Sequence, residues 1–300
     1  VTGPTGSGKS TTLYAALKHL NTPERKILTV EDPVEYNIEG INQMQVKPQI
    51  GLTFANALRS IVRQDPDVIM IGEMRDEETA AIAVQSALTG HLVLSTLHTN
   101  DAAGSITRLL DMSVEDYLLA STVNAVLAQR LVRTLCHHCR EAYTPLDDVV
   151  SRWDLQRYAG DGPVTLYRAV GCEHCGHTGY SGRNAIVELL VMTDQIKQLI
   201  LKHSDAGEIS RVAAEAGMHT MLDDGLRKAV AGKTTIEEVR RVTQEQSHTQ
   251  QLGEDPSSTA TAGAGAMPTQ PADAAEHEAE KTDSLLGGHL KTLSRFKRHE

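Results

Sequence analysis

The sequence predicts an α/β fold built on an open, parallel sheet. Three short apolar runs, "KILTV", "DVIMIG" and "HLVLST", have the composition of strands that are buried on both faces. Helical patterns separate these runs, and a glycine-rich loop at the start of the chain leads directly into a helix. Strands that alternate with helices form open sheets, and such sheets bind ligands at the carboxyl ends of their strands.

The opening stretch "VTGPTGSGKS" fits the phosphate-binding pattern G-x-x-x-x-G-K-[ST]. Glycines let backbone N–H groups surround an anion, Lys9 can reach the β- and γ-phosphates, and the Ser10 hydroxyl can bind Mg²⁺. The helix expected over residues 9–20 would point its positive end at the phosphates. A glycine-rich turn that matches by chance is the alternative. The residues expected to hold the nucleotide here are Gly3, Thr5, Gly6, Ser7, Gly8, Lys9, Ser10 and Thr11.

Carboxylates follow the first two apolar runs. "TVEDPVEY" carries Glu31, Asp32 and Glu35, and "DPDVIMIGEMRD" carries Glu73. Such acids can hold Mg²⁺ through water or orient an attacking water molecule, and a buried run followed by an acid is the Walker B arrangement. An ordinary acidic strand end is the alternative in both places.

Histidine and arginine side chains complete the candidate site. His98 follows the third run, where an imidazole can sense a γ-phosphate through one hydrogen bond; a structural role is the alternative for it and for His91. In the helix expected over residues 53–64, Arg59 and Arg63 are four residues apart and share one face. They could stay solvated, pair with the acids or reach a nucleotide held by a neighbouring subunit.

The four cysteines form two C-x-x-C pairs, a pattern that favours a metal site in a reducing compartment over disulfides. Four thiolates suit tetrahedral Zn²⁺, whereas a redox pair or metal-free thiols are the alternatives. The gap between the pairs is longer than the roughly 15–20 residues of a zinc ribbon, so it must hold extra structure, including a helix over 146–158. The predicted zinc ligands are Cys136, Cys139, Cys172 and Cys175.

Composition sets the limits on organisation and partners. The net charge of −10 and the 3% aromatic content disfavour a nucleic-acid channel, and no apolar run approaches the roughly 20 residues of a membrane span.

We expect a nucleotide-binding core, a cysteine-bearing module of irregular structure, a region of short helices and a disordered tail rich in small and polar residues. Their expected ranges are 1–130, 131–190, 191–244 and 245–300, with a last helix of the core over 114–130.

Together, "GPTGSGKSTTLYAAL", "EDPVEY", "DPDVIMIGEMRDEETA", "TGHLVLSTLHTN" and "CHHC…CEHC" make residues 1–244 resemble the secretion ATPases of type II secretion and type IV pilus assembly, the GspE/PilB group. The resemblance implies a RecA-like P-loop ATPase that uses ATP, Mg²⁺ and Zn²⁺. It makes Glu35 the acid that assists the attacking water, Glu73 the Walker B acid and His98 the His-box residue.

The resemblance also implies partners and a location. It implies a homohexamer at the cytoplasmic face of the inner membrane, in contact with the cytoplasmic portions of secretion or pilus platform proteins. Members of the group have a further domain before the phosphate loop, so we expect this chain to be an N-terminally truncated motor that hydrolyses ATP weakly by itself. A nucleic-acid translocating or uptake ATPase and a non-hydrolysing, nucleotide-binding scaffold are the alternatives.

Overall fold

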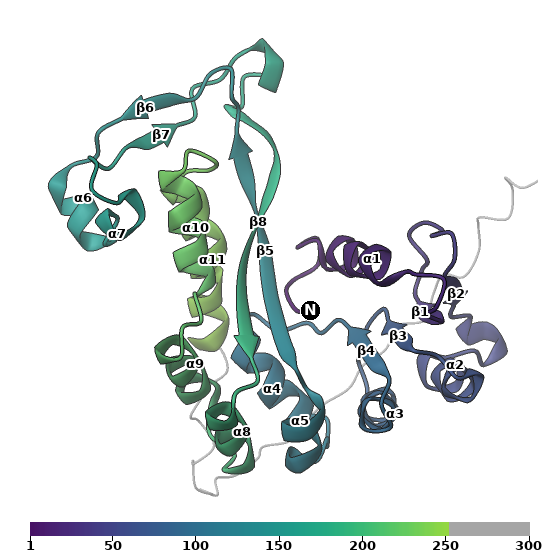
Figure 1. Cartoon of the computed structure of the whole chain (residues 1–300). Helices are drawn as coiled ribbons and strands as arrows, with labels where there is room; N and C mark the ends of the chain where they lie inside the picture. The colour runs from purple at the N-terminus through teal and green to yellow at the C-terminus, as the bar shows by residue number, and fades with distance from the viewer. Residues whose placement is uncertain (252–300) are drawn as a thin grey trace, which may run out of the picture. The chain divides into compact units, whose positions relative to one another are not determined.

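A four-stranded parallel sheet carries the first half of the chain (Figure 1). The computed structural model describes residues 1–251, which belong to one compact unit. The strand order is β2–β1–β3–β4, and β1 and β3 are buried at every position, as predicted. Strand β2, of sequence NQMQ, was not predicted because its polar residues lack an apolar run. The strands are β1 Ile27–Glu31, β2 Asn42–Gln45, β3 Val68–Ile71 and β4 Leu92–Ser95.

Helices cover both faces of this sheet. Helix α1 packs on one face, where Leu13, Tyr14 and Leu17 meet Val68 and Met70. Helices α2 and α3 pack on the other face (Figure 1). Helices α1 and α2 match their predicted ranges, 9–20 and 53–64, closely. The bounds of the three helices are α1 Lys9–Leu20, α2 Phe54–Ile61 and α3 Glu77–Leu88.

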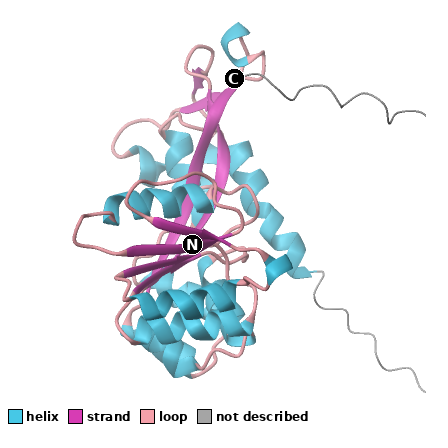
Figure 2. Ribbon diagram, turned by 90° about the vertical axis from the view of Figure 1, so that its right-hand side faces the viewer, coloured by secondary structure: helices cyan, strands magenta, loops and turns pink. Residues whose placement is uncertain are grey.

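A long antiparallel ribbon, β5 with β8, stands beside the sheet in Figure 1 and behind it in Figure 2. This corrects the sequence analysis, because the expected helix over 114–130 is helical only in α5 and then becomes β5. The expected irregular structure over 131–190 likewise contains the end of β5 and most of β8. More than forty residues separate the two strands, so no local sequence pattern predicts their pairing. The elements here are α4 Ala102–Asp111, α5 Asp116–Thr122, β5 Ala125–Leu135 and β8 Tyr180–Val191.

The cysteine-bearing segment lies at one end of the ribbon (Figure 1). It contains a small antiparallel strand pair, β6 with β7. Between these strands lie two short helices, where one helix over 146–158 was predicted. The side chains of Leu155, Val164 and Leu166 are buried against Leu226 and Ala229 of α10. The segment therefore shares an apolar cluster with the C-terminal helices. Its elements are β6 Glu141–Tyr143, α6 Asp147–Arg152, α7 Gln156–Ala159 and β7 Leu166–Arg168.

Short helices follow β8, as expected for residues 191–244. Helix α11 continues past residue 244, where the tail was expected to begin, and the rest of that expected tail lies outside the described residues. Within residues 1–251, no helix is both long and apolar enough to cross a membrane. The helices are α8 Asp194–Leu201, α9 Ala206–Glu215, α10 Met221–Val230 and α11 Ile236–Gln251.

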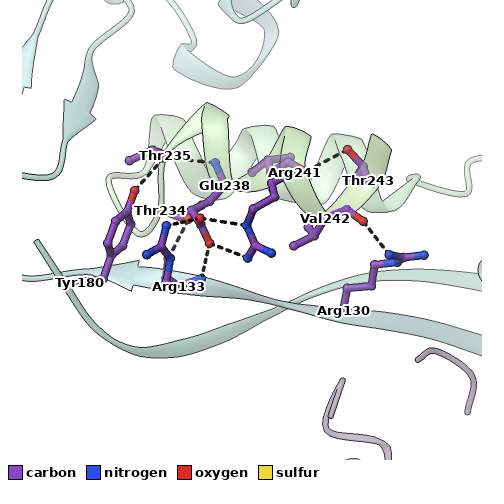
Figure 3. Close-up of polar contacts among 10 residues, drawn as sticks. Arg130, Arg133, Tyr180, Thr234, Thr235, Glu238, Arg241, Val242 and Thr243 are labelled. Atoms are coloured by element: carbon purple, nitrogen blue, oxygen red, sulfur yellow. Dashed lines mark hydrogen bonds and ion pairs between the residues drawn. The ribbon is translucent and has the colours of Figure 1, made fainter. Parts of the chain in front are cut away.

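Ionic contacts fasten α11 to β5 (Figure 3). The buried carboxylate of Glu238 accepts hydrogen bonds from the Arg133 guanidinium at 2.5 Å and from Arg241 at 3.0 and 3.2 Å. Burial opposes ionisation of Glu238, but these donors outweigh it and lower the pKa of the carboxyl to about 2. Further along the helix, Arg130 donates to the carbonyl oxygen of Val242 at 2.8 Å.

Candidate functional site

The glycine-rich loop runs from a short extended segment into α1. Thr2 pairs in parallel with Leu97, just beyond β4, and with Ala128 of β5, so the loop leaves from between these two strands. Gly6 and Gly8 have φ of 77° and 90°, in the left-handed region that glycine enters at no steric cost. Because α1 begins at Lys9, its unpaired N–H groups and positive end face the space in front of the loop.

That space is a cavity of about 650 Å³. It brings together the loop and the ends of β1, β3 and β4, as expected for an open parallel sheet. Gly3 and Ser7 belong to the loop but do not line the cavity. The predicted site residues that do line it are Thr5, Gly6, Gly8, Lys9, Ser10, Thr11, Glu31, Asp32, Glu35, Glu73 and His98.

Lys9 is held by the loop that it follows. Its Nζ donates to the carbonyl oxygens of Gly3 at 2.8 Å and Pro4 at 3.2 Å. Burial lowers the pKa of Lys9, and the nearby Glu73 carboxylate partly opposes that shift. An ammonium that is partly desolvated attracts an anion more strongly than one in water.

Glu73 connects two strand ends within the cavity. Its Oε1 lies 2.9 Å from Nε2 of His98, and its Oε2 lies 2.6 Å from the guanidinium of Arg75. The carboxylate is 17% exposed, whereas the imidazole is 43% exposed. The acid and the histidine predicted from separate motifs are therefore direct partners.

The three acids after β1 have different surroundings. Glu31 is buried and accepts hydrogen bonds from the hydroxyl of Tyr14, from Thr29 Oγ1 at 2.5 Å and from Gln43 Nε2 at 3.1 Å. Burial and then the Glu31 contact raise the pKa of Tyr14 to about 12. The same hydroxyl accepts the backbone N–H of Glu35 at 3.1 Å. Glu31 thus has protein donors on both oxygens, whereas Asp32 and Glu35 are exposed.

Arg59 of α2 and Arg63 just after this helix do not line the cavity. Arg59 pairs with Glu78 of α3, and both side chains are about half exposed. Arg63 lies in the 3₁₀ turn after α2. The structure brings neither of them to Lys9 or Glu73.

Two arginines that the sequence analysis did not select do line the cavity. Arg75 follows Glu73 by two residues, so its position beside that acid could have been inferred. Arg183 comes from β8 and could not, because the strand was not predicted.

The four cysteines meet at the far end of the ribbon. Their Sγ atoms all lie within 4.8 Å of one another. Individual Sγ–Sγ separations are 3.9 Å for Cys136–Cys172 and 3.8 Å for Cys139–Cys175 and Cys172–Cys175. Zn–S bonds of about 2.3 Å in a tetrahedron place sulfurs about 3.8 Å apart, so the cluster has the dimensions of a four-thiolate metal site.

Backbone N–H groups point at these sulfurs. Gly171 donates to Cys139 Sγ at 3.3 Å, and Cys172 and Gly179 donate to Cys175 Sγ at 3.2 Å. Donors of this kind stabilise a thiolate and orient metal ligands.

The sequence profile described as "Type II/IV secretion system protein" matches residues 1–241. This chain belongs to that family. The resemblance found in the sequence motifs is therefore confirmed.

Named relatives within the family are close to this chain. Type II secretion system protein E of Xanthomonas campestris pv. campestris is 64% identical over 245 residues, which are 82% of this chain and 43% of that protein. Type II secretion system ATPase E of Vibrio cholerae is 55% identical over 246 residues, 82% and 48% of the two chains. Type IV pilus assembly ATPase PilB of Thermus thermophilus is 54% identical over 239 residues, 80% and 27%. The chain thus spans less than half the length of these relatives.

Two solved ATPase structures share the α/β fold of this chain. The pilus retraction motor PilT, determined with bound ADP, matches with a TM-score of 0.57 and 29% identity over 83% of this chain and 62% of its own. The ATPase DotB of Legionella pneumophila matches with a TM-score of 0.57 and 26% identity over 81% and 59%.

Proposed function

We propose that this chain is the RecA-like P-loop core of an ATPase that powers type II protein secretion or type IV pilus assembly. The observation that carries the proposal is the cavity in which the glycine loop and Lys9 face the Glu73–His98 pair. Three motifs that are far apart in the sequence supply one anion-binding loop and one acid–imidazole pair. Relatives named as ATPases support the reaction.

In this proposal, the loop and α1 bind the triphosphate. Backbone N–H groups from Gly6 to Thr11 surround the phosphates, and Lys9 neutralises their charge. The Ser10 hydroxyl and the Glu73 carboxylate offer the oxygen ligands that Mg²⁺ prefers, and both line the cavity. Bound Mg²⁺ would supply Lewis-acid stabilisation of phosphate charge.

Glu35 orients the attacking water, and the acids beside it have supporting roles. Asp32 adds negative charge for water-mediated binding of the metal. Glu31 fixes Glu35 through Tyr14, whose hydroxyl donates to Glu31 and accepts the Glu35 N–H. His98 responds to the γ-phosphate by exchanging its contact with Glu73 for one with the nucleotide. Arg59 and Arg63 would act at a neighbouring subunit's nucleotide, since they lie away from this chain's own cavity lining.

Structural zinc at the four cysteines is the second part of the proposal. The Sγ separations fit a tetrahedral zinc site, and the donors from Gly171, Cys172 and Gly179 favour the thiolates that zinc requires. We also propose a division of the chain into four parts. These are the ATPase core 1–130, the tetracysteine module 131–190, the helical region 191–244 and a tail, 245–300. The ribbon β5–β8 crosses both ends of the module and so connects it to the core.

The third part of the proposal concerns the oligomeric state of the protein and its location in the cell. We infer a homohexamer on the cytoplasmic side of the inner membrane that acts on the cytoplasmic portions of membrane-embedded platform proteins and does not bind nucleic acid. The names of the relatives and the net charge of −10 support this inference.

ATP turnover by the purified full-length protein tests the proposal. We expect Mg²⁺-dependent release of phosphate that is lost in a Lys9→Ala variant and is not stimulated by DNA at low salt. Stimulation by DNA would favour a nucleic-acid motor instead. Nucleotide binding without turnover, with the full-length hexamer assembled, would favour a scaffold.

A further inference from the structure

Gln129 of β5 lies behind the glycine loop, on the side away from the cavity. Its side chain is buried, with the residue only 2% exposed, and it does not line the cavity. Its Nε2 donates to the carbonyl oxygen of Ser7 at 2.7 Å, and its Oε1 accepts from the Thr12 hydroxyl at 2.8 Å. Its backbone N–H donates to the carbonyl oxygen of Thr2 at 3.0 Å. Gln129 therefore contacts Thr2 before the turn of the loop, Ser7 within it and Thr12 after it.

The contact with Ser7 fixes the direction of a peptide group. In a trans peptide, the C=O and the N–H of the same plane point in opposite directions. Because the Ser7 carbonyl points at Gln129, the N–H of Gly8 in that plane points away from β5. Gly8 lines the cavity, so this donor is directed to the phosphate side of the loop.

The loop is also shaped to the surface of Gln129. A Cβ added at Gly3 would lie 2.3 Å from the Gln129 carbonyl oxygen, a distance that no real side chain tolerates. A Cβ at Gly8 would lie 3.1 Å from Gln129 Nε2, and φ at Gly8 is 90°. Two glycines of the motif thus allow the loop to approach Gln129 closely.

The Ser7 carbonyl sets the orientation of the side-chain amide. A carbonyl oxygen only accepts, so an amide rotated by half a turn would place two acceptor oxygens against each other. The Thr12 hydroxyl, in the first turn of α1, donates to Oε1 and so satisfies the other end of the amide in the orientation seen here.

We propose that Gln129 is a positioning residue for nucleotide binding: it holds the Ser7–Gly8 peptide with its N–H directed at the β-phosphate. The inference rests on the proposed function, since it assigns no ligand other than the nucleotide. A preorganised donor loses no freedom when the phosphate arrives, and loss of preorganisation weakens binding without removing any direct contact.

The test compares two nucleotides in the full-length protein. ADP has the β-phosphate that the loop would hold, whereas AMP lacks it, so the ratio of their dissociation constants reports the loop alone. Gln129→Met removes both amide contacts at similar size and adds no charge. Gln156→Met is the matched control, because exposed Gln156 also donates to backbone carbonyls, those of Gly160 and Gly162, but far from the cavity.

We expect Gln129→Met to reduce the preference for ADP over AMP about tenfold, which corresponds to about 1.4 kcal/mol, and Gln156→Met to leave it unchanged. A merely structural Gln129 would lower the melting temperature and leave the ratio at the wild-type value, and that result would overturn the inference. Steady-state kinetics gives a second readout. In Gln129→Met, we expect the KM for ATP to rise by a larger factor than kcat falls.

A second variant covers the case in which Gln129→Met does not fold. Thr12→Val keeps the side-chain shape of Thr12 and removes only the hydroxyl that donates to the amide oxygen. The Ser7 contact remains, so this variant should reduce the ADP preference by a smaller factor, about threefold. An unchanged ratio in this variant would also contradict the inference. Failure of the proposed function is a different result, because wild-type protein would then bind ADP no more tightly than AMP.

Discussion

His98 and Glu73 form a hydrogen-bonded pair, with Nε2 of the imidazole 2.9 Å from Oε1 of the carboxylate. The two residues follow neighbouring parallel strands, β4 and β3. Arg75 occupies the second oxygen of Glu73. Each oxygen of Glu73 therefore has a partner, one from the loop after β3 and one from the segment after β4.

We expect Glu73→Gln to reduce ATP turnover about 100-fold or more and to leave ATP bound, because the change removes a charge and little volume. Phosphate release and equilibrium nucleotide binding, measured on the same full-length sample, check this expectation. Glu77→Gln, an exposed position in the first turn of α3, is the matched control. Loss of nucleotide binding together with a lower melting temperature would show that Glu73 is structural.

Lys9→Ala should abolish measurable hydrolysis in the full-length protein. It removes the ammonium that lies at the glycine loop, and electrostatic groups of this kind contribute roughly 100- to 1,000-fold each. The same steady-state assay should find wild-type turnover in Lys202→Ala, which changes an exposed lysine after α8. Wild-type turnover in Lys9→Ala would contradict the assignment of the phosphate loop.

Protein that is purified without chelator should contain about one Zn²⁺ per chain. Cys136→Ser and Cys175→Ser should each release it, whereas His174→Ala should retain it, because four thiolates complete the coordination. Metal analysis by mass spectrometry decides between these outcomes. Wild-type protein that is stably folded without metal would contradict the zinc assignment.

Loss of zinc should expose only part of the tetracysteine module to protease. The cysteine loops around residues 136–140 and 171–179 depend on the metal, whereas Leu155, Val164 and Leu166 stay packed on α10. Cleavage mapped by mass spectrometry should therefore fall in the loops. ADP affinity should stay at the wild-type value, since the cysteines do not line the cavity.

The Glu238 contacts should make stability depend on acid pH. The pKa of this carboxyl falls from 4.5 to about 2 on folding, so its contribution is complete above about pH 4.5 and is lost as the pH falls toward 2. Glu238→Gln should lower the free energy of unfolding by about 2 kcal/mol at neutral pH and flatten the acid limb of the profile. Urea unfolding between pH 2 and 7 measures both effects. Glu215→Gln, which alters an exposed pair with Arg211, should reproduce the wild-type profile.

The parallel sheet was predictable from the sequence because its central strands are buried on both faces. β3 is an unbroken apolar run, β1 is apolar at Ile27, Leu28 and Val30, and the glycine loop predicts the start of α1. The candidate site was predictable for a related reason. Glu73 follows β3 and His98 follows its neighbour β4, and parallel strands end at one edge of the sheet.

The ribbon was not predictable by the same means. Its 11-residue strand β5, "AVLAQRLVRTL", mixes buried polar and apolar residues, and its partner β8 lies beyond the whole tetracysteine module. Gln129 and Arg183 were missed along with these strands. Gln129 has a role that depends on the Ser7 carbonyl, a contact across more than one hundred residues that no local pattern encodes.

Strand β5 touches three parts of the molecule in turn. Gln129 holds the glycine loop, Arg133 holds α11 through Glu238, and the strand ends at Leu135, next to Cys136. About 20 Å of extended chain separates the first contact from the cysteines. The glycine loop, helix α11 and the cysteine loops are therefore all attached to one continuous strand, so the spacing between the phosphate-binding end and the cysteine end of the molecule is set by the length of β5.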